Sequence, residues 1–423
     1  MASVLAKGSV GVSVFSELRM RPGLPTQRGW EASTASRLAL AVTTISILLI
    51  GSNLATPLYP LIQADLGITP FDVTIAFTCY VFALVVGLVL AGHWSDHVGR
   101  RAVLVLAVLV GLLGAAAFAS ADSLGGLVLG RSLQGTSVAL ATGASAAALR
   151  DLLPHRPGWA PRFTLIASAG GVAVGPLLGG LLSVYPHPTR TPYLVLAVVL
   201  VLLLVPLTLL RARPPVQAAA GPHPIRVLLP QRMVIGGSAR NAFWLAALVG
   251  FLSFAVFGFT LSLAPSWFAP IAGTDSRPVI GLLAGMMLFA SVLSQLLPLT
   301  GRSAVPAGLA TMALGMGILP VAGIVGSVPL LTASCLVAGA GQGVAFRRAF
   351  AALAAAVDTA GHAQTISAVY VITYLGSAVP VLGLGAASQF WGIDAAVLVF
   401  AVVIATACLA TALLVARAAP RRR

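Results

Sequence analysis

The stretch GHWSDHVGRR (residues 92–101) separates two long apolar runs, FDVTIAFTCYVFALVVGLVLA (71–91) and AVLVLAVLVGLLGAAAFASA (102–121). Neither run carries a charge after Asp72, whereas the ten residues between them hold two histidines, one aspartate and two arginines. Each run is long enough to cross a hydrocarbon layer of roughly 30 Å as a helix, which takes about 20 residues. The pattern predicts two membrane spans joined by a short polar turn.

The composition of the whole chain indicates a membrane environment. Hydrophobic residues make up 58% of the sequence, charged residues only 8%, and the mean hydropathy is +1.00. Soluble domains carry about 25% charged residues. Only helices and closed barrels span a bilayer, because the backbone must satisfy its own hydrogen bonds there. Barrel strands alternate apolar and polar residues, and these runs are continuous, so we expect an all-α integral membrane protein.

Twelve runs of this kind predict twelve transmembrane helices in two six-helix halves. Their limits are about 38–60, 71–92, 102–121, 124–149, 161–184, 191–210, 241–268, 278–299, 303–324, 328–353, 363–387 and 392–416. A Pro-rich basic stretch follows the sixth run and is typical of a linker. The predicted organisation is a cytoplasmic N-terminal tail (1–37), a first half (38–210), a cytoplasmic linker (211–240), a second half (241–416) and a basic cytoplasmic tail (417–423).

The net charge of +15 is distributed as an orientation signal. If the N-terminus is cytoplasmic, 22 of the 25 basic residues fall on the cytoplasmic side, as the positive-inside rule requires. We therefore expect a multi-pass protein of the plasma or inner membrane with both termini in the cytoplasm and no role in nucleic-acid binding. No signal-peptide core precedes residue 38, so the first span is predicted to be an uncleaved anchor. Met20 is an alternative start to Met1.

Internal repeats support two related halves. Gln134-Gly135 recurs as Gln342-Gly343, a shift of 208 positions, and Gly99-Arg100 recurs as Gly301-Arg302, a shift of 202. Pro176 and Pro380 are related by a shift of 204. Each pair joins corresponding spans, which predicts pseudo-symmetry between the halves.

Three motifs resemble signatures of the major facilitator superfamily. The loop GHWSDHVGRR matches the signature between the second and third spans at Gly92, Asp96, Gly99, Arg100 and Arg101, with a histidine where a basic residue is usual. RSLQG (131–135) resembles the fourth-span signature, and GVAVGPLLGG (171–180) matches the fifth-span pattern associated with antiporters. NLATPLYPLIQADLG (53–67) resembles the first-span end of bacterial drug-efflux members.

The loop motif implies a gate. Asp96 can accept hydrogen bonds from the N-terminus of a neighbouring helix, where the macrodipole favours an anion. Arg100 and Arg101 can bind carbonyls or acids across the interface between the halves. In the resembled family this cluster holds the cytoplasmic side closed in the outward-facing state, so we expect the same here.

The fifth-span motif implies a smooth packing surface. Small-x-x-x-small spacing puts Gly171, Gly175 and Gly179 on one helix face, where another helix can approach closely. Pro176 removes a backbone donor and bends the helix. Together with Gly180, these residues are predicted to form a surface that slides as the halves rock.

Arg131 is the strongest candidate for a functional residue. It lies about 10 Å into the membrane from the outer end of its span, at 1.5 Å per residue, and intramembrane charge by default marks function. We expect Asn53 and Gln134 to orient it and Gln342 to join it in a substrate cavity. Tyr370 and Tyr374 belong to a polar-aromatic stripe with helical spacing, and complete the predicted cavity.

The sequence predicts a secondary transporter that exports small organic molecules, drug-like compounds or metabolites, with protons as the coupling ion. Uptake or exchange of a sugar or organic acid is the alternative within transport, and a non-transporting receptor is the alternative outside it. All ten acids fall in loops, tails or span ends, so Asp65 and Asp72 are the nearest candidates for proton coupling. No phosphate loop, metal cluster or catalytic spacing is present. We therefore expect a monomer in the bilayer that needs no cofactor or metal and is no enzyme.

Overall fold

A computed structural model describes residues 29–156, 158–211, 239–297, 299, 301–357 and 362–418. Most of the predicted N-terminal tail, linker and C-terminal tail lies outside these residues. The regular secondary structure of the described residues is helical, apart from an isolated bridge between Trp30 and Leu210. Its helices are α2 (Thr34–Asn53), η1 (Thr56–Leu58), α3 (Tyr59–Leu66), α4 (Pro70–Ala91), α5 (Trp94–Val98), α6 (Arg100–Ala119), α7 (Leu124–Leu152), α8 (Trp159–Leu182), α9 (Thr191–Leu209), α10 (Arg240–Ser262), α11 (Ala264–Ala272), α12 (Arg277–Leu296), α13 (Ala304–Val325), α14 (Val328–Ala356) and α15 (His362–Ala418).

Among the described residues, ten helices are long and apolar enough to cross a membrane. The prediction of an all-α, multi-pass membrane protein is therefore confirmed. The 29-residue α7 is not among the ten; it carries Arg131 in its interior and a charged pair near its end. The 57-residue α15 is counted once, although the backbone leaves the helical region at Gly392, with φ 78° and ψ 163°.

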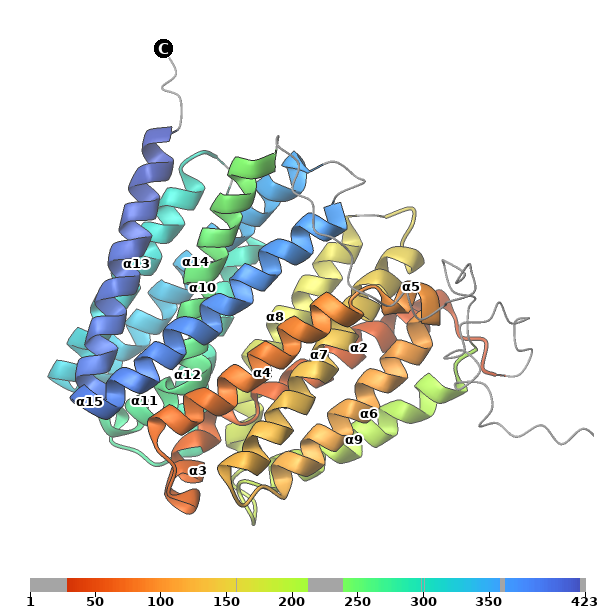
Figure 1. Cartoon of the computed structure of the whole chain (residues 1–423), viewed down its shortest axis with the longest axis horizontal. Helices are drawn as coiled ribbons and strands as arrows, with labels where there is room; N and C mark the ends of the chain where they lie inside the picture. Colours follow the sequence, from red (N-terminus) through yellow and green to blue (C-terminus); the bar gives the residue numbers. More distant parts are fainter. Residues whose placement is uncertain are drawn as a thin grey trace, which may run out of the picture.

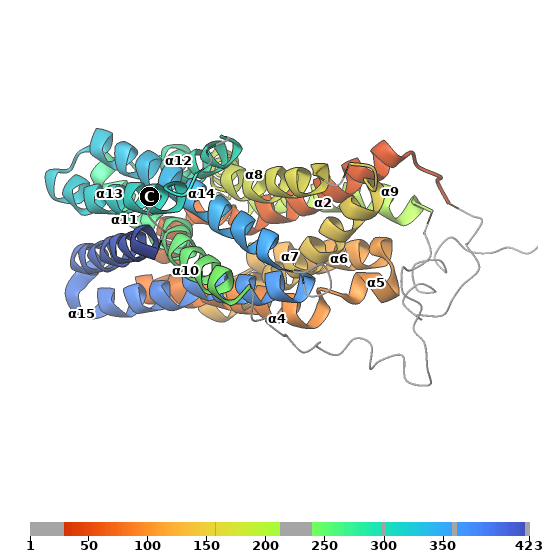
Figure 2. The same ribbon diagram turned by 90° about the horizontal axis from the view of Figure 1, so that it is seen from above.

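The helices pack as two sets. We call α2 to α9, with η1, the first set, and α10 to α15 the second set. Within the first set the main packing pairs are α6 with α7, α4 with α7 and α2 with α8; within the second they are α13 with α14, α10 with α15 and α12 with α14. Figures 1 and 2 show the two sets side by side. They meet along two helix pairs, α8 with α12 and α4 with α15.

Two of the predicted spans are broken near one end. The run expected over 38–60 forms α2, which ends at Asn53, and then the short helices η1 and α3. Pro57 lies in η1 and has no N–H to continue the α2 ladder. The run expected over 241–268 likewise ends as α10 at Ser262, and α11 follows with a proline in its first turn. The expected polar turn at 92–101 contains a helix of its own, α5.

The bundle has two chemically different ends. We call them the α3 end, where α3 contacts α11, and the α5 end, where α5 and the last turn of α15 lie (Figure 1). Because the long helices run from one end of the bundle to the other, the order of the helices tells at which end each arginine lies. Of the described arginines, only Arg190 and Arg277 lie near the α3 end, whereas twelve lie toward the α5 end.

The two sets are joined near the α3 end. Four hydrogen-bonded residue pairs among the described residues link them: Arg277 with Ser183, Ser266 with Gln63, Thr56 with the Leu261 carbonyl, and Gln389 with Thr69. Backbones also approach closely there, since a Cβ on Gly180 would meet the Arg277 backbone and one on Gly281 would meet Pro176. Polar and backbone contacts therefore close the α3 end.

Candidate functional site

Arg131 is buried in the first set, with 1% of its surface exposed. Its Nη1 donates to the backbone carbonyl of Ser52 in α2 and to Oε1 of Gln134, one turn further along α7, the latter at 3.0 Å. The guanidinium also lies over two rings of α4, 4.7 Å from the Tyr80 centroid and 5.8 Å from that of Phe77. Ring faces attract a desolvated cation, so carbonyl, amide and π contacts together stabilise the charge.

No ion pair among the described residues involves Arg131. Its own Nε and Nε2 of Gln134 lack a well-aligned hydrogen-bond partner in the described structure. The hydroxyls of Tyr59 and Tyr193 also lack well-aligned partners, although Tyr59 lies beside Arg131 and Tyr193 beside Gln134. Buried polar groups normally find partners, and ordered water commonly supplies them. We call these residues, with Tyr80, the arginine cluster. It is a compact group of hydrogen-bond donors with an uncompensated positive charge.

The predicted partner Asn53 is not part of this cluster. Its amide donates to the Leu49 carbonyl at 2.8 Å and to the Ser52 hydroxyl at 3.1 Å, both in its own helix. The α2 group that reaches Arg131 is the backbone carbonyl of Ser52. The side chains of Ser52 and Asn53 point about 100° apart around the helix axis, since a turn takes about 3.6 residues. The expectation that Asn53 orients Arg131 is wrong for this conformation.

Gln342 occupies the repeated position in the second set but has different partners. It accepts a hydrogen bond from the Ser291 hydroxyl of α12, and Gln295 donates to that same hydroxyl at 3.1 Å. The shift of 208 that relates Gln342 to Gln134 pairs Arg131 with Gly339, which packs against the backbone of Met287. The second set thus has no counterpart of the arginine at this position.

Six aromatic residues of α10, α14 and α15 form one contiguous group in the second set, and α15 packs against α4 of the first set. Tyr370 and Tyr374 of α15 were predicted for the cavity, and four phenylalanines from α10 and α14 accompany them. We call the six the aromatic wall: Phe254, Phe257, Phe346, Phe350, Tyr370 and Tyr374. Ring centroids are 4.1 Å apart between Phe346 and Phe350 and 5.2 Å apart between Phe254 and Tyr374. All six residues are partly exposed.

The aromatic wall and the arginine cluster are linked through the helices α15 and α4. Tyr374 belongs to α15, which packs against α4, and the ring of Tyr80 in α4 lies against the Arg131 guanidinium. Sequence reasoning missed Phe346 and Phe350, although their i, i+4 spacing directly after Gln342-Gly343 was visible. It also missed Tyr59 and Tyr193, since a single tyrosine in an apolar run gives no signal of its partners.

The described contacts of Asp96, Arg100 and Arg101 in the gating loop join residues of the first set. Arg100 forms ion pairs with Asp96 in its own loop and with Asp151 at the end of α7, the latter at 2.9 Å. Arg101 donates to the carbonyls of Leu210 and Thr208 at the end of α9. Gly99, at φ 105°, adopts a conformation that favours glycine. These contacts of the two arginines lie within the first set, and Asp96 pairs with an arginine instead of a helix N-terminus. The expected contact of the two arginines across the sets stays a prediction for the outward-facing state.

Gly92 is the C-cap of α4, and its backbone N–H donates to the Leu88 carbonyl in the last turn of that helix. The carbonyl oxygen of Gly92 lies close to Gly143 of α7. A Cβ on Gly143 would lie 2.9 Å from that oxygen. The first glycine of the loop motif thus packs α4 against α7 at the α5 end.

The glycines of the fifth-span motif serve two interfaces. Gly171, Gly175 and Gly179 face α2, where a Cβ on each would meet backbone or Cβ atoms of residues 46–54. Gly180 faces α12 of the other set, and the Pro176 carbonyl lies against Gly281 of α12. The motif therefore joins a tight contact inside the first set to the contact between the sets.

The two acids considered for proton coupling lie at the surface. Asp72 closes the N-terminus of α4 by a capping box with Thr69, which satisfies helix donors that would otherwise lack partners. Asp65 is exposed near the end of α3. Neither touches the arginine cluster in the described contacts.

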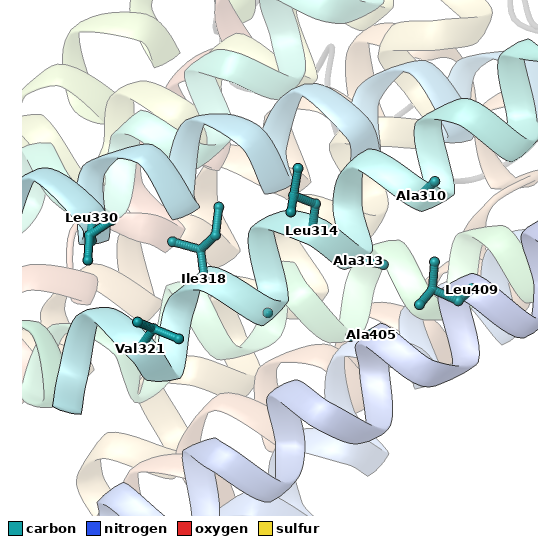
Figure 3. Close-up of a pocket in the computed structure, with 9 residues that line it drawn as sticks. Ala310, Ala313, Leu314, Ile318, Val321, Leu330, Ala405 and Leu409 are labelled. Atoms are coloured by element: carbon teal, nitrogen blue, oxygen red, sulfur yellow. The ribbon is translucent and has the colours of Figure 1, made fainter. Parts of the chain in front are cut away.

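An apolar cavity of about 570 Å³ lies elsewhere, against α13 and the last part of α15 (Figure 3). Its lining includes Leu314, Val321 and Leu409, which are each about half exposed or more, and all nine lining residues are apolar or glycine. A substrate site needs a few polar groups to orient its ligand. This surface is therefore lipid-facing and is not the substrate site.

Residues 41–306 match the family model described as Major Facilitator Superfamily. That match covers more than half of the chain. The chain belongs to the major facilitator superfamily. It is accordingly a multi-pass membrane protein of a transporter family.

Curated superfamily relatives include drug-resistance proteins. The chain is 29% identical over 161 residues to a chloramphenicol resistance protein of Pseudomonas aeruginosa, which covers 37% of this chain and 38% of the relative. It is 38% identical over 106 residues to the class E tetracycline resistance protein of Escherichia coli, covering 24% and 25%. A putative multidrug resistance protein of Enterobacter is 29% identical over 127 residues, covering 30% and 27%. The chain thus aligns with well under half the length of these relatives.

Solved superfamily structures cover nearly the whole chain. A bacterial homologue of the human lysosomal transporter Spinster, in an inward-facing and unoccupied conformation, gives a TM-score of 0.74 at 13% identity and covers 92% of this chain and 98% of that one. A mutant form of the nucleoside transporter NupG gives 0.70 at 15% identity and covers 89% and 99%. At such identities the likeness shows the fold alone.

Proposed function

We propose that this chain is a secondary transporter that exports small, partly aromatic organic molecules. The observation that carries the proposal is the aromatic wall, whose six residues remain partly exposed beside the contact between the two sets. Aromatic faces bind apolar and aromatic ligands through large buried areas and offset stacking. The drug-resistance relatives support export of drug-like compounds in particular.

The architecture that we propose is twelve spans in two pseudo-symmetric halves. Counting α7 as a span and dividing α15 at Gly392 adds two to the ten apolar helices. The halves correspond to residues 38–210 and 241–416, joined by a cytoplasmic linker and flanked by cytoplasmic tails. The gathering of arginines at the α5 end supports a cytoplasmic location for that end. The protein acts as a monomer in the inner membrane.

The described conformation corresponds to the inward-facing state of this transporter. The four hydrogen-bonded pairs between the sets lie near the α3 end, and the described contacts of Asp96, Arg100 and Arg101 lie within the first set. Substrate would enter from the α5 end, and rocking of the halves would open the α3 end. Gly180 and Pro176 lie on the surface that must separate.

Proton exchange is the coupling that we propose. Among the described residues no carboxylate touches the arginine cluster, so Asp65 and Asp72 near the α3 end are the acids to test. A reversed pH gradient across proteoliposomes should reverse the direction of transport, and Asp72→Asn should weaken this response more than Asp122→Asn, another acid at the same end. Transport that ignores the gradient would indicate a facilitator or another coupling ion.

Drug transport by everted membrane vesicles tests the function. Chloramphenicol and tetracycline serve as probes, because relatives are named for resistance to them. Phe254→Ala or Tyr374→Ala should raise the KM for a transported probe about 2- to 10-fold, from the roughly 0.5–1.5 kcal/mol that one aromatic contact contributes beyond its buried area. The matched control is Phe390→Ala. Phe390 lies in the part of α15 before Gly392 that also carries Tyr374, and it is 82% exposed.

Each alternative predicts a different outcome. Uptake or exchange of a sugar or organic acid would give counterflow of those compounds and no energised accumulation of drugs in everted vesicles. A receptor would bind a ligand without flux. Either result, with the protein correctly inserted, would overturn the export proposal.

A further inference from the structure

The short helix α11 brings the second set into contact with the first at the α3 end (Figure 1). It follows the break after α10 and has Pro265 in its first turn. Besides α10 and α12, it contacts α3 and η1 of the first set. The Ser266 hydroxyl donates to Oε1 of Gln63 in α3 at 2.5 Å. Helix α11 therefore carries the second set's side of one contact that closes this end.

The next residue, Trp267, fastens α11 to its own set. The residue is 4% exposed, and a Cβ on Gly323 of α13 would collide with its ring. Its Nε1 donates to Oδ1 of Asp394 at 2.8 Å. Asp394 lies in α15, two residues after the non-helical Gly392. Successive helical side chains point about 100° apart, so Ser266 and Trp267 reach neighbours in different sets.

The two bonds respond differently when the sets separate. The bond between Ser266 and Gln63 joins α11 to the first set and must break when the α3 end opens. The bond between Trp267 and Asp394 lies within the second set and can persist in both states. A buried indole N–H that loses its acceptor carries a desolvation penalty, so this bond favours positions of α11 in which Trp267 reaches Asp394.

We propose that Asp394 is a positioning residue for the opening of the α3 end. Through Trp267 it holds α11 on the second set, so that α11 leaves α3 together with that set. Without this bond the motion of the second set is no longer transmitted to the contact between Ser266 and Gln63, and opening becomes slower. The transport role rests on the proposed function, since it requires that the sets rock, whereas the attachment of α11 does not.

Hydrogen–deuterium exchange of the purified full-length protein tests the attachment, because local opening sets the rate at which backbone amides exchange. Asp394→Ala should speed exchange in α11 about 5-fold, the effect of one partly exposed hydrogen bond to a charged group. Asp394→Asn keeps an acceptor oxygen for the indole N–H and should exchange like wild type. So should the matched control Asp275→Ala, which removes an exposed acid from the turn between α11 and α12.

A second variant removes the donor instead of the acceptor. Trp267→Phe keeps a buried ring and loses only the N–H, so it should speed exchange in α11 as Asp394→Ala does. In the double variant the two effects should not add, because both changes remove the same bond. Thermal unfolding checks that each variant is folded, and if Asp394→Ala is unfolded, Trp267→Phe decides.

Transport kinetics in everted vesicles test the role in opening. Each single variant should lower kcat for a transported probe about 5-fold and leave KM within about 2-fold of wild type, because the aromatic wall is unchanged. Asp394→Asn should keep the wild-type kcat, which a change of the surface charge alone would not allow.

Four outcomes would overturn the proposal. Unchanged exchange of α11 in Asp394→Ala and Trp267→Phe would show that the bond does not hold α11. Additive effects in the double variant would show that the two residues act separately. Equal loss in Asp394→Asn and Asp394→Ala would assign the effect to the charge, and faster exchange with unchanged kcat would separate α11 from opening. If the wild-type protein gives no flux, the proposed function fails, and the exchange experiment still decides whether Asp394 holds α11.

Discussion

Arg277 holds the two sets together at the α3 end, and we expect Arg277→Ala to shift the protein toward a conformation that is open there. The residue begins α12 and reaches the end of α8 in the first set. Its Nε donates to the Ser183 hydroxyl at 3.0 Å and its Nη2 to the Ser183 carbonyl at 3.1 Å. Because opening must break both bonds, alanine destabilises only the closed state.

The size of the shift follows from these two bonds. A hydrogen bond from a charged donor contributes about 1.5–3 kcal/mol when it is buried. Arg277 is partly exposed, so we assign about 1 kcal/mol to each bond after solvent screening. A total of about 2 kcal/mol changes the ratio of closed to open molecules about 30-fold. A population that is mostly closed would then become measurably mixed.

Distances between spin labels measure this population. Labels at Asp122, in the α6–α7 turn, and at Ile324, near the end of α13 and 80% exposed, report on opposite sets at the α3 end, once the three native cysteines are replaced. Arg277→Ala should add a longer-distance component in double electron–electron resonance, and Arg277→Lys should give a smaller one. Arg190→Ala, a change of equal charge at the same end, is the control. Identical distributions for wild type and Arg277→Ala would refute the reasoning.

Three further changes test the site and its supports. Arg131→Ala should nearly abolish efflux and Arg131→Lys impair it, because lysine loses the planar fork; near-normal efflux by the alanine variant, normalised to inserted protein, would remove this residue from the mechanism. Asp96→Asn should cost less than about 1 kcal/mol in stability, since its ion pair is partly exposed, yet reduce flux if the loop engages the second set in the other state; parallel thermal unfolding and transport assays separate the two effects. Gly179→Val should lower the melting temperature far more than Gly170→Val, because only the first Cβ would collide with a neighbouring backbone; equal effects would contradict the packing argument.

The sequence alone was sufficient for the class of protein and its family. Apolar runs and the polar loop at 92–101 are local patterns, and the bilayer imposes the same length on every span. The prediction of an all-α membrane protein of the major facilitator superfamily is confirmed for that reason. The breaks after Asn53 and Ser262 were not predicted, because hydropathy averages over windows and does not register where a proline interrupts the backbone ladder.

The sequence also located part of the candidate site. Arg131 was recognisable as an intramembrane charge, and Gln134 lies one turn away on the same helix, so their contact follows from helical geometry. The Ser52 carbonyl and the ring of Tyr80 come from other helices, and no spacing along the chain predicts them. We expected Asn53 to contact Arg131 because its side chain is polar. The packing of α2 instead places the backbone carbonyl of Ser52 against Arg131.

Partner choice in the gating loop was likewise decided by tertiary structure. The motif residues Asp96, Arg100 and Arg101 were readable in the sequence, but the acid at the end of α7 and the carbonyls at the end of α9 that bind them lie 51 to 109 residues away. Local sequence determines which segments become helices and where charge is tolerated, because these depend on the solvent around each segment. Which groups meet depends on how distant helices pack and on which end of the bundle is closed, and only the folded chain specifies that.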